Sequence, residues 1–197
     1  MNPLPDRHAL RRELRARRRS LPAATRIDAA NALAAHLLAL PFAPSSGHVA
    51  GYWAMDGEIG LHAWQMQLPE SVAYCLPVLH EERQLLFAPW RPGEALVTNR
   101  YGIPEPDVPA SALIEPKRMS MVVMPLVAFD ARRQRLGMGG GWYDRSFGFR
   151  QATAAPPWLV GAAFAVQQLE AIDAADWDVA LDAVCSENAT HLAKAIA

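Results

Sequence analysis

Short hydrophobic runs alternate with amphipathic segments along this chain of 197 residues. The runs are rich in valine, leucine and alanine, as expected of strands buried on both faces of a parallel sheet. The amphipathic segments repeat apolar residues at intervals of three and four, which indicates helices with one buried face. The pattern therefore predicts an open α/β sheet, and ligands of such sheets gather at the carboxyl ends of the strands.

Five runs are predicted to be strands: residues 47–55, 72–79, 84–90, 119–128 and 158–165. The run at 119–128 is apolar and contains adjacent valines, so we expect it at the centre of the sheet. The run at 84–90 contains Pro89, which cannot donate a ladder hydrogen bond, so we expect it near an edge. Residues 80–83 would form the hairpin tip between the second and third strands.

Four segments are predicted to be helices. The first begins at Asp6, whose side chain can cap it, and the second lies between Pro22 and Pro41. The apolar face of the second helix is expected to comprise Ile27, Ala30, Ala34, Leu37 and Leu38. The third helix is expected within residues 59–68 and the fourth within residues 142–149, directly after a glycine-rich stretch.

Composition favours one domain, because 51% of the residues are hydrophobic and no internal repeat or low-complexity block interrupts the chain. Cys75 and Cys185 lack metal-like spacing and are expected to be reduced thiols. The longest apolar run, residues 32–42, is too short to span a membrane and no signal-like segment is present. We therefore expect a soluble cytoplasmic protein with no membrane partner.

Positive charge is concentrated at the amino end. The first 26 residues carry eight arginines against Asp6 and Glu13, so they hold +6 while the remainder holds −7. Four of these arginines, Arg7, Arg11, Arg15 and Arg18, fall on one helical stripe beside the leucines that would dock the helix. The stripe has three interpretations: a solvated basic face, a nucleic-acid-binding arm, or a clamp on an anionic small ligand. No aromatic residue is interleaved for base stacking, which counts against single-stranded nucleic acid.

The segment RLGMGGGWYDR, residues 135–145, carries the clearest chemical signal. Glycines at 137, 139, 140 and 141 allow backbone N–H groups to turn inward and form an anion-binding nest, and the following helix adds its positive N-terminal end. Arg135 and Arg145 flank the nest with groups that suit phosphate, and Asp144 offers a hard oxygen ligand for Mg²⁺. By itself such a loop can also serve packing, and it is neither a P-loop nor a dinucleotide fingerprint.

Other catalytic classes lack support. The six histidines show no HExxH or other close pairing, and neither a G-x-S-x-G elbow nor an SxxK motif occurs. The isolated acids also have ordinary interpretations, because Glu58 precedes a predicted helix and Asp182 precedes a short apolar run within residues 177–187. Residues 101–108, which present Glu105 between prolines, are typical of a rigid connector.

Taken together, these segments resemble the 5-formyltetrahydrofolate cyclo-ligase family, also called 5,10-methenyltetrahydrofolate synthetases. The resemblance extends over nearly the whole chain and rests on segments that occur in the family's order. They are RHALR with RRSL, YWAMDGEI, GIPEP, MPLVAFD leading into RLGMGGGWYDR, and WDVALDAV. It implies a three-layer α/β/α fold with a mainly parallel sheet, similar to sugar-isomerase and CoA-transferase relatives.

The resemblance also implies ATP-dependent cyclisation of 5-formyltetrahydrofolate, with Mg²⁺ as cofactor and small molecules as the only partners. Arg7 and Arg11 would contact ATP, and its phosphates would be wrapped by Arg135, Leu136, Gly137, Met138, Gly139, Gly140, Gly141, Trp142 and Tyr143. Trp53 and Glu58 would bind the folate, and Asp144 and Asp182 would hold Mg²⁺. Arg135, Tyr143 and Glu58 are the predicted catalytic residues. A monomer or weak homodimer is expected.

Several positions depart from the family pattern. Arg7 stands where Lys is common, Trp142 replaces a Tyr, and Met138 and Gly140 replace larger or basic residues. Arg133 occupies a turn position that is usually Gly. The alternatives to an enzyme are therefore a non-catalytic nucleotide- or folate-binding paralogue and, less favoured by the acidic remainder, a nucleic-acid binder.

Overall fold

The structure, a computed structural model, describes residues 7–193, so the predicted Asp6 cap lies outside the described residues. Its α-helices are α1 (Arg7–Arg19), α2 (Ala23–Leu38), α3 (His62–Gln65) and α4 (Trp142–Phe147). Single 3-10 turns occur at Glu81–Arg83, Ala110–Ala112, Pro116–Arg118, Gly148–Gln151 and Ala165–Gln167. The two long helices are those that the amphipathic pattern predicts, whereas α3 is shorter than the segment 59–68.

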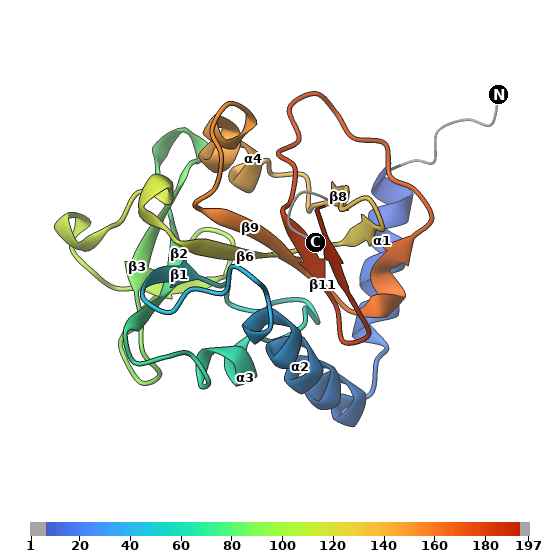
Figure 1. Ribbon diagram of the computed structural model, residues 1–197, viewed down its shortest axis with the longest axis horizontal. Coiled ribbons are helices and arrows are strands. Elements are labelled where there is room, and N and C mark those ends of the chain that lie inside the picture. The colour runs from blue at the N-terminus through green and yellow to red at the C-terminus, as the bar shows by residue number, and fades with distance from the viewer. Residues whose placement is uncertain (1–6, 194–197) are drawn as a thin grey trace.

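A seven-stranded sheet forms the centre of the molecule (Figure 1), with strand order β12-β11-β9-β6-β1-β2-β3. The strands are β1 (Gly47–Ala50), β2 (Val72–Leu79), β3 (Leu85–Pro89), β6 (Met121–Pro125), β9 (Trp158–Ala162), β11 (Ala183–Cys185) and β12 (Thr190–Leu192). All neighbouring pairs from β2 to β11 are parallel, while β3 and β12 are antiparallel edges. The mixed α/β class with a mainly parallel sheet is thus confirmed, as is the edge position of the strand with Pro89.

Both faces of the sheet are covered, as Figure 1 shows, with α2 and α3 on one side and α4 on the other. The central strand β6 demonstrates the alternation directly. Met121 and Val123 pack in the cluster with α2 and α3, whereas Val122 and Met124 pack in the cluster that contains Phe147 of α4. This two-sided burial is why the run is continuously apolar.

The predicted strand 119–128 is in fact two strands. It breaks after β6, and β7 (Ala128–Asp130) joins β8 (Arg135–Leu136) and β10 (Gln168–Leu169) in a separate three-stranded sheet. The break is stable because side chains satisfy its carbonyls: Gln167 Nε2 donates to Leu126 O at 2.7 Å and to Val127 O at 3.0 Å. This small sheet carries the chain toward the glycine-rich segment.

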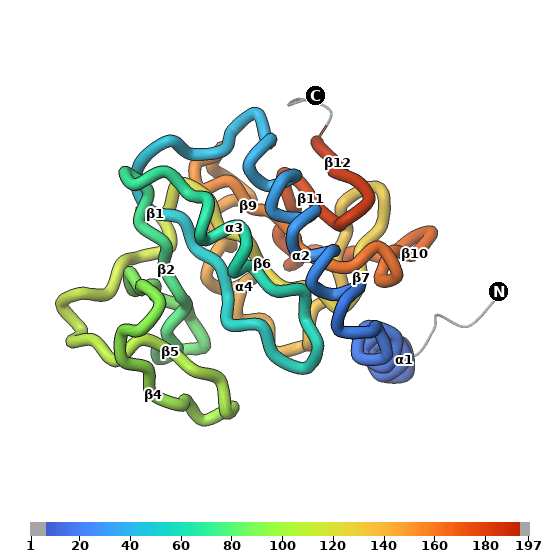
Figure 2. The backbone as a smooth tube through the Cα atoms, turned by 90° about the horizontal axis from the view of Figure 1, so that it is seen from below, coloured from blue at the N-terminus to red at the C-terminus, as the bar shows by residue number. Residues whose placement is uncertain are grey.

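Two further expectations need correction. Ile27 was predicted on the buried face of the second helix but is 62% exposed, and Ala29 and Leu33 are buried instead. The predicted connector 101–108 contains β5 (Pro104–Pro106), which pairs with β4 (Leu96–Thr98) in an antiparallel ribbon. Figure 2 shows this ribbon and α1 on opposite sides of the molecule.

The strand order places a topological switch beside β1. From β1 the chain moves to its neighbour β2 on one side, whereas the next strand of this sheet after β6 is β9 on the other side, so the connections that leave the carboxyl ends of β1 and β6 run in opposite directions. Open α/β sheets bind ligands in the crevice at such a switch. Within the described residues no helix is long and apolar enough to cross a membrane.

Candidate active site

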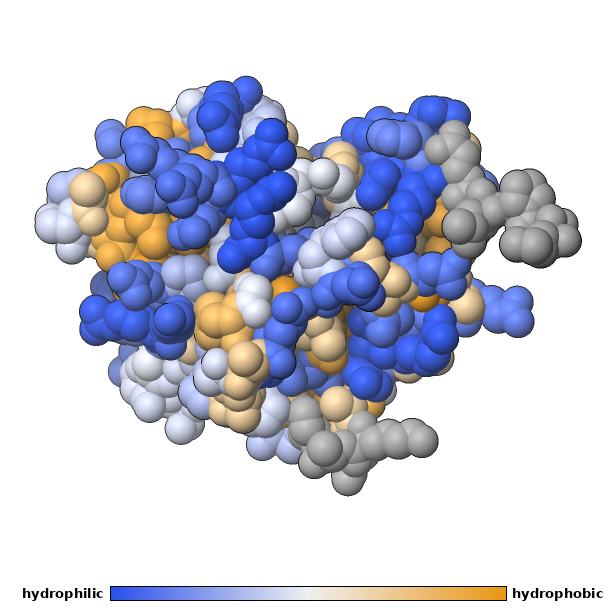
Figure 3. Space-filling model, turned by 90° about the horizontal axis from the view of Figure 1, so that it is seen from above, coloured by the Kyte–Doolittle hydropathy of each residue, from blue (hydrophilic) through white to orange (hydrophobic). Residues whose placement is uncertain are grey.

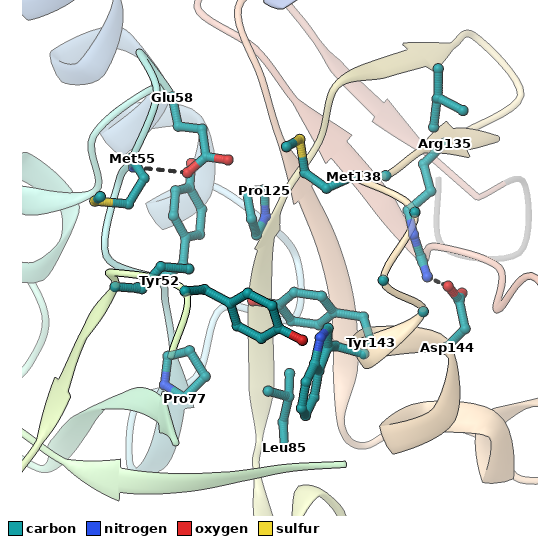
Figure 4. Close-up of a pocket in the computed structure, with 18 of the residues that line it drawn as sticks. Tyr52, Met55, Glu58, Pro77, Leu85, Pro125, Arg135, Met138, Tyr143 and Asp144 are labelled. Atoms are coloured by element: carbon teal, nitrogen blue, oxygen red, sulfur yellow. Dashed lines mark hydrogen bonds and ion pairs between the residues drawn. The ribbon is translucent and has the colours of Figure 1, made fainter. Parts of the chain in front are cut away.

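A pocket of about 600 Å³ lies at this switch. Tyr52 and Trp53 follow β1, Pro125 ends β6, and Pro77 lies on β2, so the sheet supplies the floor. In the close-up view, Glu58 lies on one side of the pocket and the Arg135–Asp144 pair on the opposite side (Figure 4). Seen from above, hydrophilic residues cover most of the surface, which is indented between two lobes (Figure 3). The pocket is therefore two-sided, with different chemistry on each side.

The glycine segment forms one side of the pocket. Gly139 and Gly141 have φ angles of +95° and +68°, which an L side chain rarely adopts. The carbonyl groups of the segment are held by arginines, since Gly137 O accepts from Arg11 Nε at 2.8 Å and Gly140 O accepts from Arg145 Nη1 at 2.8 Å. Within residues 7–193, no N–H of residues 139–141 donates to another protein group. The segment thus has the free donors that a nest needs for an oxyanion.

Helix α1 brings its arginines to this pocket. Arg7 and Arg11 line it beside the glycine segment, and Arg7 Nη2 also donates to Asp173 O at 2.6 Å. Arg18 lines it too but is fully buried. Burial and the neighbouring Arg7 lower the pKa of Arg11. Arg7 and Arg11 thus line the cavity, so this part of the stripe is more than a solvated basic face, while the Arg18 guanidinium is bound by protein groups.

The turn after β1 forms the other side of the pocket. Glu58 Oε2 accepts from Met55 N at 2.9 Å, and Arg18 Nη2 lies 3.5 Å from Glu58 Oε1. Burial raises the pKa of Glu58, against the opposing effects of the Met55 amide and Arg18. Burial alone would also raise the pKa of Asp56, but hydrogen bonds from Arg15 and Arg18 outweigh it and lower that pKa. Glu58 is thus a largely desolvated acceptor aimed into the pocket.

Aromatic side chains line the space between the two sides. Burial raises the pKa of the Tyr143 hydroxyl, with Glu58 as the next cause, so this hydroxyl stays protonated and can donate a hydrogen bond. Trp53 packs edge-on against Trp90, with 5.6 Å between ring centroids. Trp142 packs edge-on against Tyr101 of the β4–β5 loop, with 6.0 Å between ring centroids. Such rings provide apolar walls for a flat heterocycle.

Arg135 and Asp144 form an ion pair on the phosphate-competent side. Arg135 Nη1 also donates to Val179 O at 2.9 Å, and Val179 N donates to Asp144 Oδ1 at 3.2 Å. Asp144 Oδ2 accepts no hydrogen bond from the described residues, so one hard oxygen remains available to a cation. No group of three or more His, Cys, Asp or Glu that could hold a metal occurs in residues 7–193. Such a donor set suits a Mg²⁺ ion carried by phosphates better than an all-protein metal cage.

Asp182 lies elsewhere. Both its oxygens accept from Arg150 Nη2 at 3.0 Å, and Oδ2 also accepts from Leu159 N at 2.7 Å. Asp182 is not among the residues that line the pocket. The structure therefore does not bring Asp182 together with Asp144, and a role for Asp182 in metal binding would require Arg150 to release it.

Apart from Asp182, the structure brings every predicted site residue to this one pocket. These residues are Arg7, Arg11, Trp53, Glu58, Arg135, Leu136, Gly137, Met138, Gly139, Gly140, Gly141, Trp142, Tyr143 and Asp144. Sequence reasoning missed Tyr52, Tyr101 and Trp177, which also line it, and gave no separate role to Arg18 or Asp56. The only available signal for Tyr101 was its stiff loop, which the sequence alone could not place beside Trp142.

A sequence model of the 5-formyltetrahydrofolate cyclo-ligase family matches residues 4–187. The chain belongs to this family. The 5-formyltetrahydrofolate cyclo-ligase of Haemophilus influenzae is 34% identical over 178 residues, which cover 89% of this chain and 94% of that protein. That of Escherichia coli K12 is 34% identical over 174 residues, which cover 87% and 94%. The Aquifex aeolicus 5,10-methenyltetrahydrofolate synthetase structure is similar with a TM-score of 0.78 at 25% identity, covering 94% of this chain and 92% of that one.

Two departures from the cyclo-ligase family pattern have a structural account. Arg133 adopts φ +68°, the left-handed conformation that explains why Gly is usual there. Its side chain compensates by donating to Leu181 O at 3.2 Å and Leu192 O at 3.1 Å. Trp142 retains an aromatic ring against Tyr101, and the Arg100 guanidinium lies 5.5 Å from the Trp142 ring. Neither departure blocks the pocket.

Proposed function

We propose that this chain catalyses the ATP-dependent cyclisation of 5-formyltetrahydrofolate to 5,10-methenyltetrahydrofolate, with release of ADP and phosphate. The observation that carries the proposal is the two-sided pocket at the sheet switch. One side offers free backbone N–H groups and arginines, and the other offers a desolvated carboxylate with aromatic walls. The activity in the names of the relatives from H. influenzae and E. coli supports the same assignment.

The glycine segment and α1 would bind the triphosphate. N–H groups of Gly139, Gly140 and Gly141 would donate to phosphate oxygens, while Arg7 and Arg11 would neutralise their charge. Arginine, rather than lysine, suits this side of the pocket because a guanidinium can hold a backbone carbonyl and still face an oxyanion. Arg11 already holds Gly137 O in this way.

The turn after β1 would bind the reduced folate. A pterin ring presents several N–H donors at one edge, and Glu58 is a carboxylate acceptor whose position is fixed by the Met55 amide. Trp53 would pack against the ring system, and Tyr143 would donate its protonated hydroxyl from α4 between the two sides. These contacts would fix the pterin while the formyl group faces the γ-phosphate.

The chemistry needs activation of a poor leaving group. Attack of the formyl oxygen on the γ-phosphorus breaks the bond to ADP and gives an imidate-type phosphate. N10 then attacks the activated carbon, its proton is lost, and departure of phosphate leaves the methenyl bridge. Positioning and charge neutralisation dominate such a transfer, so Arg135 and the nest would act on the transferred phosphoryl group without a protein nucleophile.

Asp144 is the residue that would hold Mg²⁺, through the oxygen that Arg135 and Val179 leave free. The ion supplies charge neutralisation for the phosphate oxygens when it is bound. The family resemblance also implies Asp182 as a ligand, and that assignment stays a prediction because Arg150 holds its carboxylate.

The experiment that tests the proposal is direct. The purified chain is incubated with 5-formyltetrahydrofolate and Mg-ATP, and the methenyl chromophore and ADP are followed together. We expect one ADP for each methenyl product, with no product when ATP or Mg²⁺ is omitted. A folded chain that binds both substrates but forms neither product would instead be the non-catalytic binding paralogue.

A further inference from the structure

Arg18 is a fully buried cation near the end of α1, at the border of the pocket. All three of its nitrogens are engaged. Nε donates to Asp56 O at 3.0 Å, Nη2 donates to Asp56 Oδ2 at 2.9 Å, and Nη1 donates to Leu126 O at 3.3 Å. Nη2 also lies 3.5 Å from Glu58 Oε1. One guanidinium therefore joins three parts of the chain: α1, the turn after β1, and the break between β6 and β7.

Anchoring of α1 does not by itself require this burial. Arg15 Nε already donates to Asp56 Oδ2 at 2.6 Å, and Arg19 Nη1 donates to Asp56 Oδ1 at 3.1 Å. The side chains of Arg15 and Arg19 remain 33% and 52% exposed, whereas that of Arg18 is 0% exposed. A buried charge is costly to desolvate unless it is fully paired. Among these three arginines only Arg18 contacts Glu58 and Leu126, so its buried guanidinium links the turn after β1 to the break between β6 and β7.

The turn that Arg18 contacts has an unusual backbone conformation. Asp56 and Gly57 adopt φ +50° and +76°, and a Cβ on Gly57 would lie 3.0 Å from Arg19 Cγ. A non-Gly residue in the left-handed region persists only when its surroundings enforce it. The hydrogen bonds from Arg18 to Asp56 stabilise this conformation. The conformation of the turn then sets the direction of the Glu58 side chain.

We propose that Arg18 is a positioning residue for folate: it fixes the turn at residues 56–58 between α1 and Leu126 so that the Glu58 carboxylate faces the pterin. The inference rests on the proposed function of Glu58 and assigns Arg18 no contact with the reacting atoms. Because the same helix carries Arg7 and Arg11, Arg18 also joins the folate side of the pocket to the element that would bind ATP.

The experiment uses the full-length chain with four variants: Arg18→Met, Arg18→Lys, Glu58→Gln and the double variant Arg18→Met/Glu58→Gln. Arg15→Gln and Arg19→Gln are matched controls, since both arginines bind Asp56 but lie outside the pocket. For each chain, KM for 5-formyltetrahydrofolate, KM for ATP and kcat are measured, with circular dichroism to verify folding. We expect Arg18→Met to raise the folate KM about 10-fold or more, the size of one lost charged contact, and the ATP KM by less than about 2-fold. Both controls should stay within about 2-fold of the parent chain.

The double variant distinguishes positioning from a merely structural role. If Arg18 acts through Glu58, the folate KM of the double variant equals that of the worse single variant, because the second change removes nothing further. Multiplied effects, an equal rise of both KM values, or the same loss in Arg15→Gln would overturn the inference. If Arg18→Met does not fold, Arg18→Lys carries the test, since it keeps the charge but loses the fork. A folded parent chain without turnover would overturn the proposed function itself.

Discussion

Arg11 Nε donates to the carbonyl oxygen of Gly137 at 2.8 Å, across 126 positions of sequence. This bond joins the first helix to the glycine segment, and both elements line the pocket. The remaining guanidinium nitrogens of Arg11 are not hydrogen-bonded to another described residue. Arg11 thus holds the loop and can face an anion at the same time.

We predict that Arg11→Gln weakens ATP capture selectively. It removes a charged donor to phosphate together with the brace on Gly137, so the ATP KM should rise about 10- to 100-fold, as expected for a hydrogen bond to a charged group. The folate KM should change much less. Arg12→Gln on the exposed face of the same helix is the control, because it lowers the charge of α1 equally. Equal effects of the two variants would indicate a general charge effect instead.

The second prediction concerns the backbone of the nest. Gly141 adopts φ +68°, and a Cβ there would lie 2.7 Å from Arg145 Nη1. Gly141→Ala therefore combines backbone strain of about 1–2 kcal/mol with displacement of the arginine that holds Gly140 O. We expect loss of ATP binding in calorimetry while the folate site persists. Gly148→Ala, at the end of α4, is the control because a Cβ there meets nothing within 4 Å. Undiminished ATP binding by Gly141→Ala would argue against the nest.

Much of this site could be predicted from local chemistry. Glycines that require unusual φ angles, as at residues 139 and 141, leave a sequence signal because few other residues tolerate that conformation. The strand at 72–79 was predicted with its observed bounds, because its apolar run lies in the sheet and is closed by polar residues. Such features depend on neighbours in sequence, and sequence reasoning captures them.

Features that depend on residues distant in sequence could not be predicted. The break after β6 is stabilised by Gln167 and Arg18, which lie far from Leu126 in sequence, so an unbroken apolar run concealed it. Arg18 itself looked like one more arginine on a basic stripe, and only the fold shows that it is buried against Asp56. Asp182 was assigned from resemblance alone, and its pairing with Arg150 could not be foreseen from a spacing of 32 residues. Tertiary contacts decide these cases.

The third prediction separates the two aspartates. Asp144→Asn should raise the Mg²⁺ concentration needed for half-maximal turnover, because its free oxygen is the proposed ligand. Asp182→Asn should mainly lower stability, since Arg150 loses its ion pair in a poorly exposed site, at a cost of about 2–4 kcal/mol. Mg²⁺ titrations of activity and urea unfolding of both variants test this contrast. A Mg²⁺ requirement shifted equally in Asp182→Asn, with unchanged stability, would make Asp182 a ligand after all.

The fourth prediction concerns the pH dependence of folate binding. Burial raises the pKa of Glu58, and among the groups that face it the Met55 amide, Arg18 and Arg15 lower this pKa while Asp56 raises it. If the ionised carboxylate accepts hydrogen bonds from the pterin, folate affinity should increase as pH rises through this elevated pKa, above the ordinary range for glutamate.

Ionisation of Glu58 has the opposite effect on folding stability: it lowers stability, whereas it raises folate affinity. The folded state favours the protonated carboxyl, so Glu58 costs stability once pH passes its ordinary pKa, and Glu58→Gln should remove that cost at neutral pH. Glu58→Gln should therefore flatten the pH profile of folate binding, lower affinity at pH values above the pKa of Glu58, and yet unfold at equal or higher urea concentration than the parent chain. Calorimetry with 5-formyltetrahydrofolate in a pH series that starts at the ordinary glutamate pKa and extends above it follows the transition. A parent profile that is flat over this range, or that survives unchanged in Glu58→Gln, would remove Glu58 from the folate site.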